Sequence, residues 1–490
     1  MPEYEAALDV LTDIWAEVLQ RKRDTISPED SFFEIGGDSL KALWMIDRAA
    51  ERGLAFTPRQ VFGFPVLGEL AALAAALPTP ATAPRDTGPE FSGGPSGLSR
   101  AQEWMATHDH PSLNVHTLLR WGGDLSVPLL ERSLQWLTER HAALRTVFPR
   151  DGERPVARVL PDVRVAIRTA DLRGGERAVT VQDALPQAGV RVREPFDLAD
   201  GPLLRLDALR LADQEWLLVL VVHHLNTDGW SMGVLADELL ACYRALEHGH
   251  QPPRLPATRP YAEFGAGEDT RHLPYWQRRL EGAQPLFGGG NTVSLPSLQH
   301  AFTVPESAVA AVRSAARAGT PASVVPLTAL AIALERMTGR SDIVIGTSVS
   351  NRGTRDFART VGFFANTLWL RLDLRRSEDL ADRLGAVRDS YLDGLTHSLP
   401  IEALFETGAD FGQVLFNYID MPLDTGDRDV EPVPVSLAVA EQYQDLFLTL
   451  VDDGRSLHGL LTHTTRWFTP ERAGRLVEEL IGVLHELGEA

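Results

Sequence analysis

Apolar residues at helical spacing mark the first part of the chain. Between residues 6 and 20 they recur every three or four positions, which predicts an amphipathic helix with one buried face. Similar stripes over residues 40–50 and 67–77 predict two further helices, and a turn around Ser27-Pro28 follows the first helix. We therefore expect a small helical domain over residues 1–78.

A stretch rich in proline, glycine, threonine and serine covers residues 79–97 and predicts a linker. Beyond it, helical patterns alternate with β-branched and apolar runs, which is typical of an α/β or α+β domain. The helical patterns cover residues 127–140, 232–246, 380–395 and 470–487, and the strand-like runs cover residues 216–222, 342–345 and 446–451. The length of this domain, residues 98–490, favours two lobes of about 98–265 and 266–490, with a proline-rich hinge at 251–260.

Composition excludes several classes of function. The formal charge of -20 argues against nucleic-acid binding, which needs basic surface to displace counterions from phosphates. A single cysteine, Cys242, excludes an intrachain disulfide and a thiolate metal cluster, and it fits a reducing cytoplasm. The acidic N-terminus lacks a signal pattern, and no apolar run reaches the roughly 18 residues of a membrane span. We expect a soluble, cytoplasmic protein without membrane contact.

Ser39 is a candidate modification site. Gly36 and Gly37 interrupt the chain just before the second predicted helix, so that Ser39 opens this helix on an exposed turn. The plainer interpretation is a helix-capping serine that satisfies backbone donors. The helix itself is more apolar than one buried stripe requires, so we expect two or three of its side chains to face partners, with a broad core face as the alternative. These apolar residues are Leu40, Leu43, Trp44, Met45 and Ile46.

Two adjacent histidines follow the strand-like run at residues 216–222. Because successive strand side chains point to opposite faces, only one of His223 and His224 can face a given cavity, and the other is expected to be packed on the far side. The same geometry, and the absence of a His-Glu-x-x-His spacing, argue against a metal site. Histidine is well suited to hold or move a proton near neutral pH. Asp228, in the following turn, is expected to fix the loop by an ion pair.

A competing motif overlaps this segment. Residues 229–233 read Gly-Trp-Ser-Met-Gly and match the Gly-x-Ser-x-Gly nucleophile elbow of α/β-hydrolases, with Ser231 as the nucleophile. An elbow serine follows its strand through a very tight turn, whereas several polar residues separate Ser231 from the apolar run. No glycine-rich oxyanion loop lies upstream in the required context. A serine hydrolase or thioesterase is therefore the least favoured hypothesis.

Residues 5–77 resemble the peptidyl carrier domains of nonribosomal peptide synthetases. The resemblance lies in Asp-Ser-Phe-Phe-Glu-Ile-Gly-Gly-Asp-Ser-Leu at 30–40 and in Val-Phe-Gly-Phe-Pro at 61–65. It implies a small all-α four-helix carrier bundle with 4'-phosphopantetheine attached covalently to Ser39, and hence a phosphopantetheinyl transferase as a partner. The thiol of the arm would carry an aminoacyl or peptidyl group as a thioester.

The rest of the chain, from about residue 97 to 488, resembles the condensation domains of the same synthetases. His-His-Leu-Asn-Thr-Asp-Gly-Trp-Ser at 223–231 looks like the signature of that family, and other family motifs occur in the expected order. They are Leu-Ser-Arg-Ala-Gln at 98–102, Arg-His-Ala-Ala-Leu-Arg-Thr-Val-Phe at 140–148, Glu-Pro-Phe-Asp-Leu at 194–198, Tyr-Ala-Glu-Phe at 261–264, Val-Gly-Phe-Phe-Ala-Asn-Thr at 361–367 and His-Ser-Leu-Pro-Ile-Glu at 397–402. The resemblance implies a two-lobed α/β fold similar to chloramphenicol acetyltransferase, with the histidine motif where the lobes meet.

The resemblance also assigns roles to single residues. His224 would line a tunnel entered from two sides and act on the attacking amine, whereas His223 would be structural. Four further positions would support the site: Asp228 and Arg145 as an ion pair that holds the loop, Gly229 as a backbone amide near the reacting carbonyl, and Asn366 on the second-lobe side of the tunnel.

Three features depart from the usual family pattern. Glu103-Trp104-Met105 stands where the family usually has an arginine and a longer aromatic stretch, and Asn226-Thr227 are more polar than usual. Both differences could alter the lining of the tunnel. The segment at residues 265–297 is shorter than usual, which affects the expected surface between the lobes.

The function implied is amide-bond formation, in which the amine of an acceptor aminoacyl thioester attacks the carbonyl of a donor thioester. A carrier domain ahead of a condensation domain would deliver the donor, here of the L-configured or glycine type. Upstream and downstream adenylation and carrier domains of a larger synthetase would be partners, because this chain shows no adenylation domain. An epimerising relative and a non-catalytic domain that recruits a tailoring enzyme remain the alternatives.

Overall fold

The structure is a computed structural model. It describes residues 2–76, 98–174, 178–264, 270–287, 295–400, 402–405, 413–420, 429–435, 437, 441–442 and 444–489. The expected linker at residues 79–97 lies outside the described residues.

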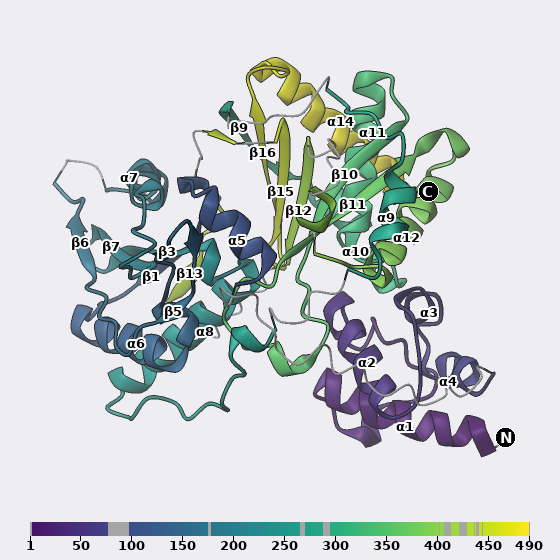
Figure 1. Ribbon diagram of the computed structural model, residues 1–490, viewed down its shortest axis with the longest axis horizontal. Helices are drawn as coiled ribbons and strands as arrows, with labels where there is room; N and C mark the ends of the chain where they lie inside the picture. The colour runs from purple at the N-terminus through teal and green to yellow at the C-terminus, as the bar shows by residue number, and fades with distance from the viewer. Residues whose placement is uncertain are drawn as a thin grey trace.

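Four α-helices form the N-terminal domain, drawn in purple in Figure 1, as the apolar stripes and the resemblance predict. Leu11, Ile14 and Trp15 of the first stripe are all 0% exposed, because one face of the first helix packs against the other helices. The elements are α1 Pro2–Leu19, the 3-10 turn η1 Arg23–Thr25, α2 Ser39–Glu51, α3 Pro58–Gly63 and α4 Leu67–Ala76.

The first lobe of the larger domain is built on a five-stranded sheet in the order β13-β1-β8-β7-β6. Its central strand β8 (Glu215–His223) alternates between two buried faces. Leu218, Leu220 and Val222 pack with helices α6 and α8, whereas Leu217, Val219 and Val221 pack with α7. The sheet is therefore covered by helices on both sides, and β8 runs through the core toward the two histidines.

The elements of this lobe, in chain order, are as follows. They are α5 Arg100–Thr107, η2 Pro111–Leu113, β1 Asn114–Gly122, α6 Val127–Arg140, η3 Ala142–Arg145, β2 Thr146–Val147, β3 Arg150–Asp151, β4 Arg154–Pro155, β5 Arg158–Val159, β6 Arg168–Asp171, α7 Val181–Arg193, β7 Leu204–Ala212, β8 Glu215–His223, η4 His224–Asn226, α8 Gly229–Glu247 and η5 Tyr261–Glu263.

The second lobe holds a seven-stranded sheet in the order β11-β10-β12-β15-β16-β9-β14. Helix α11 is buried along most of its length, since it packs against α12 and α14 and against strand β10. The elements are α9 Leu273–Leu280, β9 Leu295–Val304, α10 Glu306–Arg317, α11 Val324–Thr338, β10 Asp342–Val349, η6 Arg355–Phe357, β11 Asn366–Asp373, η7 Leu374–Arg376, α12 Leu380–Thr396, α13 Glu402–Phe405, β12 Val414–Asp420, β13 Val430–Pro432, β14 Glu441–Gln442, β15 Leu446–Asp452, β16 Leu457–Thr464 and α14 Pro470–Glu489.

One strand crosses between the lobes. Strand β13 belongs by sequence to the second lobe, yet it pairs antiparallel with β1 of the first, with Leu119 opposite Pro432 and Trp121 opposite Val430. The apolar pattern did not predict this exchange, because a three-residue strand carries too little periodicity to identify its partner. Since β12 and β14 belong to the seven-stranded sheet, this crossing links the two sheets through the chain.

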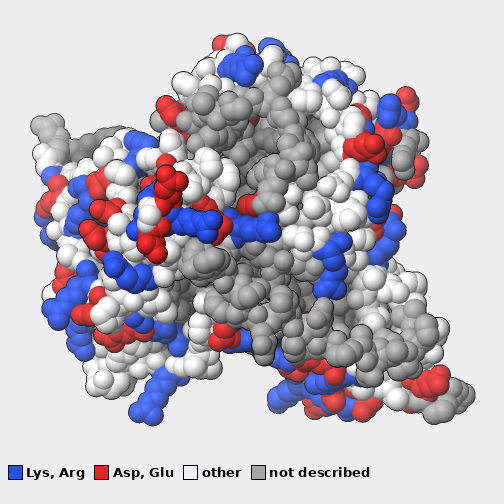
Figure 2. Space-filling view, in the orientation of Figure 1, with Lys and Arg blue, Asp and Glu red and all other residues white. Residues whose placement is uncertain are grey.

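The N-terminal helical domain lies below the second lobe in Figure 1, with α2 and α3 turned toward it. Helix α3 contacts α12, where Arg59 forms ion pairs with Asp389 and Asp393. On the face seen in Figure 2, basic and acidic side chains lie interspersed rather than gathered into a basic patch. Among the helices that the structure describes, none has the length and apolar character to cross a bilayer.

Candidate active site

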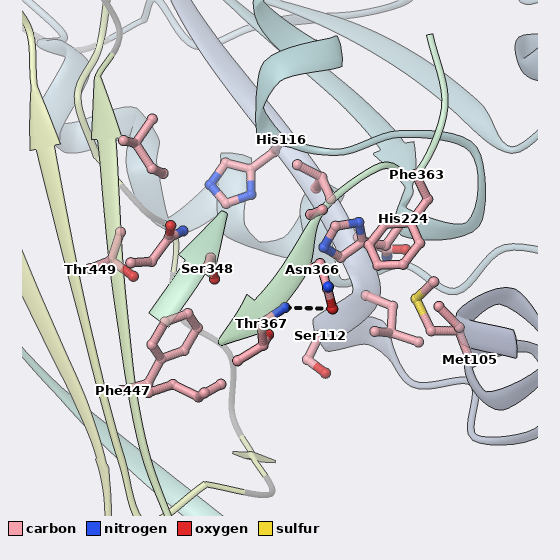
Figure 3. A pocket seen from close by; sticks show the side chains of 18 of the residues that line it. Met105, Ser112, His116, His224, Ser348, Phe363, Asn366, Thr367, Phe447 and Thr449 are labelled. Atoms are coloured by element: carbon pink, nitrogen blue, oxygen red, sulfur yellow. Dashed lines mark hydrogen bonds between the residues drawn. The ribbon is translucent and has the colours of Figure 1, made fainter. Parts of the chain in front are cut away.

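A cavity of about 700 Å³ lies between the two lobes. The first lobe contributes side chains from α5, β1 and the turn after β8, and the second lobe contributes side chains from the inner face of its sheet. Figure 3 shows Met105, Ser112, His116 and His224 from the first lobe with Ser348, Asn366, Thr367, Phe447 and Thr449 from the second. The meeting of the lobes therefore forms one chamber that contains the predicted histidine.

His224 lines this cavity and is held in one orientation. Strand β8 ends at His223, and His224 begins a 3-10 turn in which its Nδ1 lies 2.7 Å from the carbonyl oxygen of Thr227. Since a carbonyl only accepts, Nδ1 carries the proton and Nε2 keeps a lone pair. The ring of Phe363 stands edge-on to the imidazole at 4.8 Å, and no hydrogen bond to Nε2 is found among the described residues. Burial lowers the pKa of His224, which favours this neutral, accepting form.

His223 is packed on the opposite side, as strand alternation predicts. It is 1% exposed, its Nε2 lies 3.0 Å from Oδ1 of Asp109, and its Nδ1 accepts the N–H of Leu225 at 3.2 Å. Both ring nitrogens are therefore engaged in holding the turn that carries His224.

The expected ion pair between Asp228 and Arg145 is wrong. The Arg145 guanidinium instead donates to the carbonyl oxygens of Thr138 at 2.9 Å and Leu160 at 2.5 Å, because its short 3-10 turn places it over these loops of the first lobe. The partner of Asp228 is Arg352 of the second lobe, at 3.2 and 3.3 Å. Asp228 is 1% exposed and Arg352 is 0% exposed, so the loop is fixed by a buried ion pair between the lobes.

Asp228 does more than pair with arginine. Its side chain caps helix α8 by accepting the N–H of Ser231 at 2.7 Å, and it also accepts the N–H of Phe364 at 3.0 Å. Phe364 follows directly on Phe363, the ring beside His224. One carboxylate thus connects the start of α8, the second lobe and the wall of the cavity next to the histidine.

Ser231 is not a nucleophile elbow. It lies inside helix α8, is 0% exposed, and its hydroxyl donates to the carbonyl of Gly362 at 2.9 Å while accepting from Arg352 at 2.8 Å. A hydroxyl that is buried and bonded in this way joins the lobes and is closed to a substrate. The structure therefore argues against the hydrolase hypothesis.

Of Gly229 and Asn366, only Asn366 is among the residues that line the cavity. Gly229 begins helix α8, it is exposed, and a side chain there would meet nothing within 4 Å. Its N–H is one of the first-turn amides that have no partner within the helix. Asn366 begins β11 and lines the cavity, where its amide donates to the carbonyl of Leu399 at 2.7 Å and accepts the N–H of Thr367 at 2.9 Å, the bond drawn in Figure 3. This amide holds the wall of the cavity in place.

Of the unusual positions in the sequence, Trp104 and Met105 do line the cavity. Trp104 is 38% exposed and stacks on His108. Asn226 and Thr227 are buried instead, and they shape the turn: the Asn226 amide donates to the carbonyl of Thr146 at 2.8 Å, and the Thr227 carbonyl binds His224. Parts of the short segment at residues 265–297 lie outside the described residues.

Ser39 is the first residue of α2 and is partly exposed. The capping role that a serine could fill belongs to Asp38, whose carboxylate accepts the N–H of Lys41 at 2.8 Å. Gly37 is needed at its position, since a Cβ there would lie 2.3 Å from the Phe32 ring. With no hydrogen bond to the Ser39 hydroxyl found among the described residues, the hydroxyl stands at a tight, accessible turn, and this fits a site of covalent phosphopantetheine attachment.

No cluster of three or more His, Cys, Asp or Glu side chains suited to a metal ion occurs in the described part of the chain. The functional residue that the sequence did not reveal is Arg352. It stands alone after strand β10, 124 positions from Asp228, and only the folded arrangement of the lobes shows that a buried carboxylate needs it.

Comparison with known families matches both parts of the chain. Residues 9–74 match the family model described as phosphopantetheine attachment site, and residues 97–487 match the model described as condensation domain.

Curated relatives include much larger proteins. Malpibaldin synthetase of Mortierella alpina is 31% identical over 97% of this chain, which spans 9% of that protein. Phosphinothricin tripeptide synthetase PhsC of Streptomyces viridochromogenes is 32% identical over 87% of this chain, which spans 42% of it. The chain thus covers less than half the length of these relatives.

Solved structures share the fold of the larger domain. The first condensation domain of the CDA synthetase superposes with a TM-score of 0.70 at 24% identity, covering 80% of this chain and 95% of that one. The epimerization domain from the third module of tyrocidine synthetase B gives a TM-score of 0.66 at 18% identity, covering 80% of this chain and 95% of that one. These likenesses confirm the expected two-lobed, chloramphenicol-acetyltransferase-like α/β fold.

Proposed function

The chain belongs to the condensation domain family of nonribosomal peptide synthetases and carries a phosphopantetheine carrier domain ahead of the condensation domain, and we propose that it joins a donor acyl group to an acceptor amine. The observation that carries this proposal is the orientation of His224. Its Nδ1–H is held by the Thr227 carbonyl, and its unprotonated Nε2 is left for a substrate in a cavity between the lobes.

The chemistry requires two acyl thioesters to meet in that cavity. When bound to Ser39, phosphopantetheine supplies a thiol that carries the donor acyl group as a thioester. The attacking amine forms the C–N bond as the C–S bond breaks, and the proton lost by the amine ends on the departing sulfur, which leaves as a thiol. No covalent bond to the protein is therefore needed. Nε2 of His224 accepts a hydrogen bond from this amine, and it either orients the amine or removes its proton. The walls hold both reactants in attack geometry, which can supply much of the rate.

The supporting residues keep this arrangement in place. His223 and Asp228 hold the turn on which His224 sits, and Arg145 and Asn366 hold neighbouring loops by binding main-chain carbonyls. Gly229 offers a first-turn N–H close to the same turn, for which no acceptor is found among the described residues, and we assign it to the reacting carbonyl oxygen.

The proposal includes a donor of the L-configured or glycine type, modification of Ser39 by a phosphopantetheinyl transferase, and adenylation and carrier domains of the same synthetase as partners. An epimerising activity is the second candidate. The likeness to an epimerization domain, at 18% identity, concerns the fold alone, and that fold accommodates both activities.

Mass spectrometry of intact carriers tests the proposal. Ser39 is loaded from an aminoacyl-coenzyme A by a phosphopantetheinyl transferase, which transfers the aminoacyl phosphopantetheine to the serine and releases adenosine 3',5'-bisphosphate. An aminoacyl acceptor carrier is then added. We expect the donor mass to move to the acceptor carrier. Release of free acid would indicate a thioesterase. With the reaction run in D2O and quenched in H2O, uptake of one deuterium at the α-carbon would indicate an epimerase, and no change in mass would indicate a recruiting domain. The control is the same chain without transferase treatment, and it should transfer no donor mass to the acceptor carrier.

A pH profile tests the role of the neutral imidazole. Burial disfavours the imidazolium, so the pKa of His224 lies below the usual 6.5 and the accepting form persists into mildly acidic solution. We expect kcat/KM with soluble substrates, calculated for the unprotonated form of the acceptor amine, to stay level from pH 8 to 6.5. It should fall only below pH 6.5, the usual pKa of a histidine, because the pKa of His224 is lowered from there. Burial also lowers the pKa of His116, another residue of the cavity wall, to about 4. An acid limb that begins above pH 7 would contradict the assignment.

A further inference from the structure

The carrier domain contacts the condensation domain at Arg352, the ion-pair partner of Asp228, and at Trp230 near the start of helix α8. The Trp44 Nε1–H on carrier helix α2 donates to the main-chain carbonyl of Arg352 at 2.8 Å. The Trp44 indole also stands edge-on to Trp230 of helix α8 at 6.4 Å. Trp44 is only 7% exposed, so the condensation domain covers it, as the surplus apolar surface of this helix predicts.

Two further contacts join the carrier domain to the same loop, residues 351–356, which we call the Arg352 loop. The Arg355 guanidinium donates to the main-chain carbonyl of Glu17 on α1 at 3.0 Å. On α2, Arg48 forms an ion pair with Asp356 at 3.5 Å. Two carrier helices therefore hold one short loop of the condensation domain.

The side chain of Arg352 points the other way, into the condensation domain. Its guanidinium binds Asp228 at 3.2 Å and Ser231 at 2.8 Å, and it donates to the carbonyls of Phe357 at 2.7 Å and Thr360 at 2.8 Å. Arg352 thus contacts the carrier domain through its main-chain carbonyl, and its side chain contacts Asp228 and Ser231 at the start of α8. Because the guanidinium is 0% exposed and tightly packed, a shift of the Arg352 backbone would also move the guanidinium.

What the guanidinium holds lies next to the proposed catalytic histidine. Asp228 accepts the amide N–H of Ser231 at the start of α8 and that of Phe364 in the cavity wall. Phe363, one residue earlier, places its ring 4.8 Å from His224. A shift of the Arg352 loop would therefore move both the turn that carries His224 and the ring packed against it.

We propose that Trp44 and Arg352 are positioning residues, through which the docked carrier domain holds residues 224–228 in their reactive arrangement. We call this segment, which begins with the turn that carries His224, the Asp228 loop. This rests on the proposed function and extends it. The docked carrier then has a second effect besides delivering the donor: it increases the rate of condensation. Without a docked carrier, the His224 turn would be held less rigidly. Delivery alone would leave the chemistry of a small, diffusible donor unaffected by Trp44.

The experiment uses the full chain with Ser39 left unmodified, supplied with a soluble aminoacyl N-acetylcysteamine thioester as donor and a soluble amine acceptor. The Trp44→Ala variant loses the contact, and Trp44→Phe keeps a ring against Trp230 but loses the N–H. We expect kcat to fall roughly tenfold in Trp44→Ala, the factor equal to about 1.4 kcal/mol for one lost hydrogen bond, and less in Trp44→Phe, with the KM for the soluble donor unchanged.

Amide hydrogen exchange gives a readout that does not depend on turnover. The N–H groups of Ser231 and Phe364, both bound to Asp228, should exchange faster in Trp44→Ala than in the wild-type chain. Arg59→Gln is the matched control at the same domain interface, since it removes exposed ion pairs to α12 without touching the Arg352 loop. It should change neither kcat nor exchange by more than about twofold.

The outcomes separate this inference from the proposed function. If Trp44→Ala turns over the soluble donor at the wild-type rate, or if exchange at Ser231 and Phe364 is unchanged, the inference is overturned while amide formation stands. If the wild-type chain forms no amide from any donor, the proposed function fails, and the exchange measurement still decides whether the carrier holds the Asp228 loop.

Discussion

Replacing His224 with alanine should lower kcat for amide formation by about 100- to 10,000-fold, the range expected when a positioned acid–base side chain is removed. The reason is geometric: among the described residues, Nε2 of His224 is an unprotonated ring nitrogen of the cavity wall for which no hydrogen bond is found. The carrier should still be loaded at Ser39, since that residue lies on a separate domain. Single-turnover transfer from the loaded carrier, followed by mass spectrometry, measures the loss.

Two further variants make the result interpretable. A His224→Asn variant can accept a hydrogen bond from the amine but cannot take its proton, so substantial activity in it would identify orientation as the main contribution. His250→Ala changes an exposed histidine beyond the end of α8 and should leave the rate unaltered. Wild-type transfer by His224→Ala would remove His224 from the mechanism.

Local features of the site could be read from the sequence because short-range rules govern them. The alternation of side chains along β8 predicted that His223 and His224 serve different sides, and the structure packs His223 against Asp109. Helix α6 spans the residues that the apolar period marked, Val127–Arg140. The glycine pair before Ser39 predicted a turn, and the steric need for Gly37 beside Phe32 explains it.

Contacts between distant segments could not be predicted in this way. The partner of Asp228 lies 124 residues away on a loop with no periodic pattern, and Trp44 meets a carbonyl 308 residues away. Arg145 shows the same limit. The family resemblance predicted that it pairs with Asp228, whereas its guanidinium binds main-chain carbonyls within its own lobe. Such contacts depend on how the lobes and domains pack against each other, and the spacing of residues along the chain does not determine that packing.

Loss of the Arg352 charge should destabilise the condensation domain strongly. The Arg352→Met variant keeps an unbranched side chain but leaves the Asp228 carboxylate, 1% exposed, without its counter-ion. Breaking a buried pair from one side costs about 3–5 kcal/mol, whereas an exposed pair contributes about 0–1 kcal/mol. Urea unfolding measures the free energy of unfolding. Arg336→Met, at a surface pair with Glu486, is the matched control and should change it by less than about 1 kcal/mol.

A double variant shows whether the cost arises from the pair. In Arg352→Met with Asp228→Asn, the stranded charge is gone, while asparagine can still cap helix α8 by accepting the Ser231 N–H. The double variant should therefore be more stable than the sum of the two single losses, with a coupling energy of at least about 1 kcal/mol. Simple additivity would mean that the loop is held by the capping and main-chain bonds alone. Recovery of stability without recovery of turnover would instead show that the charge itself sets the position of the His224 turn.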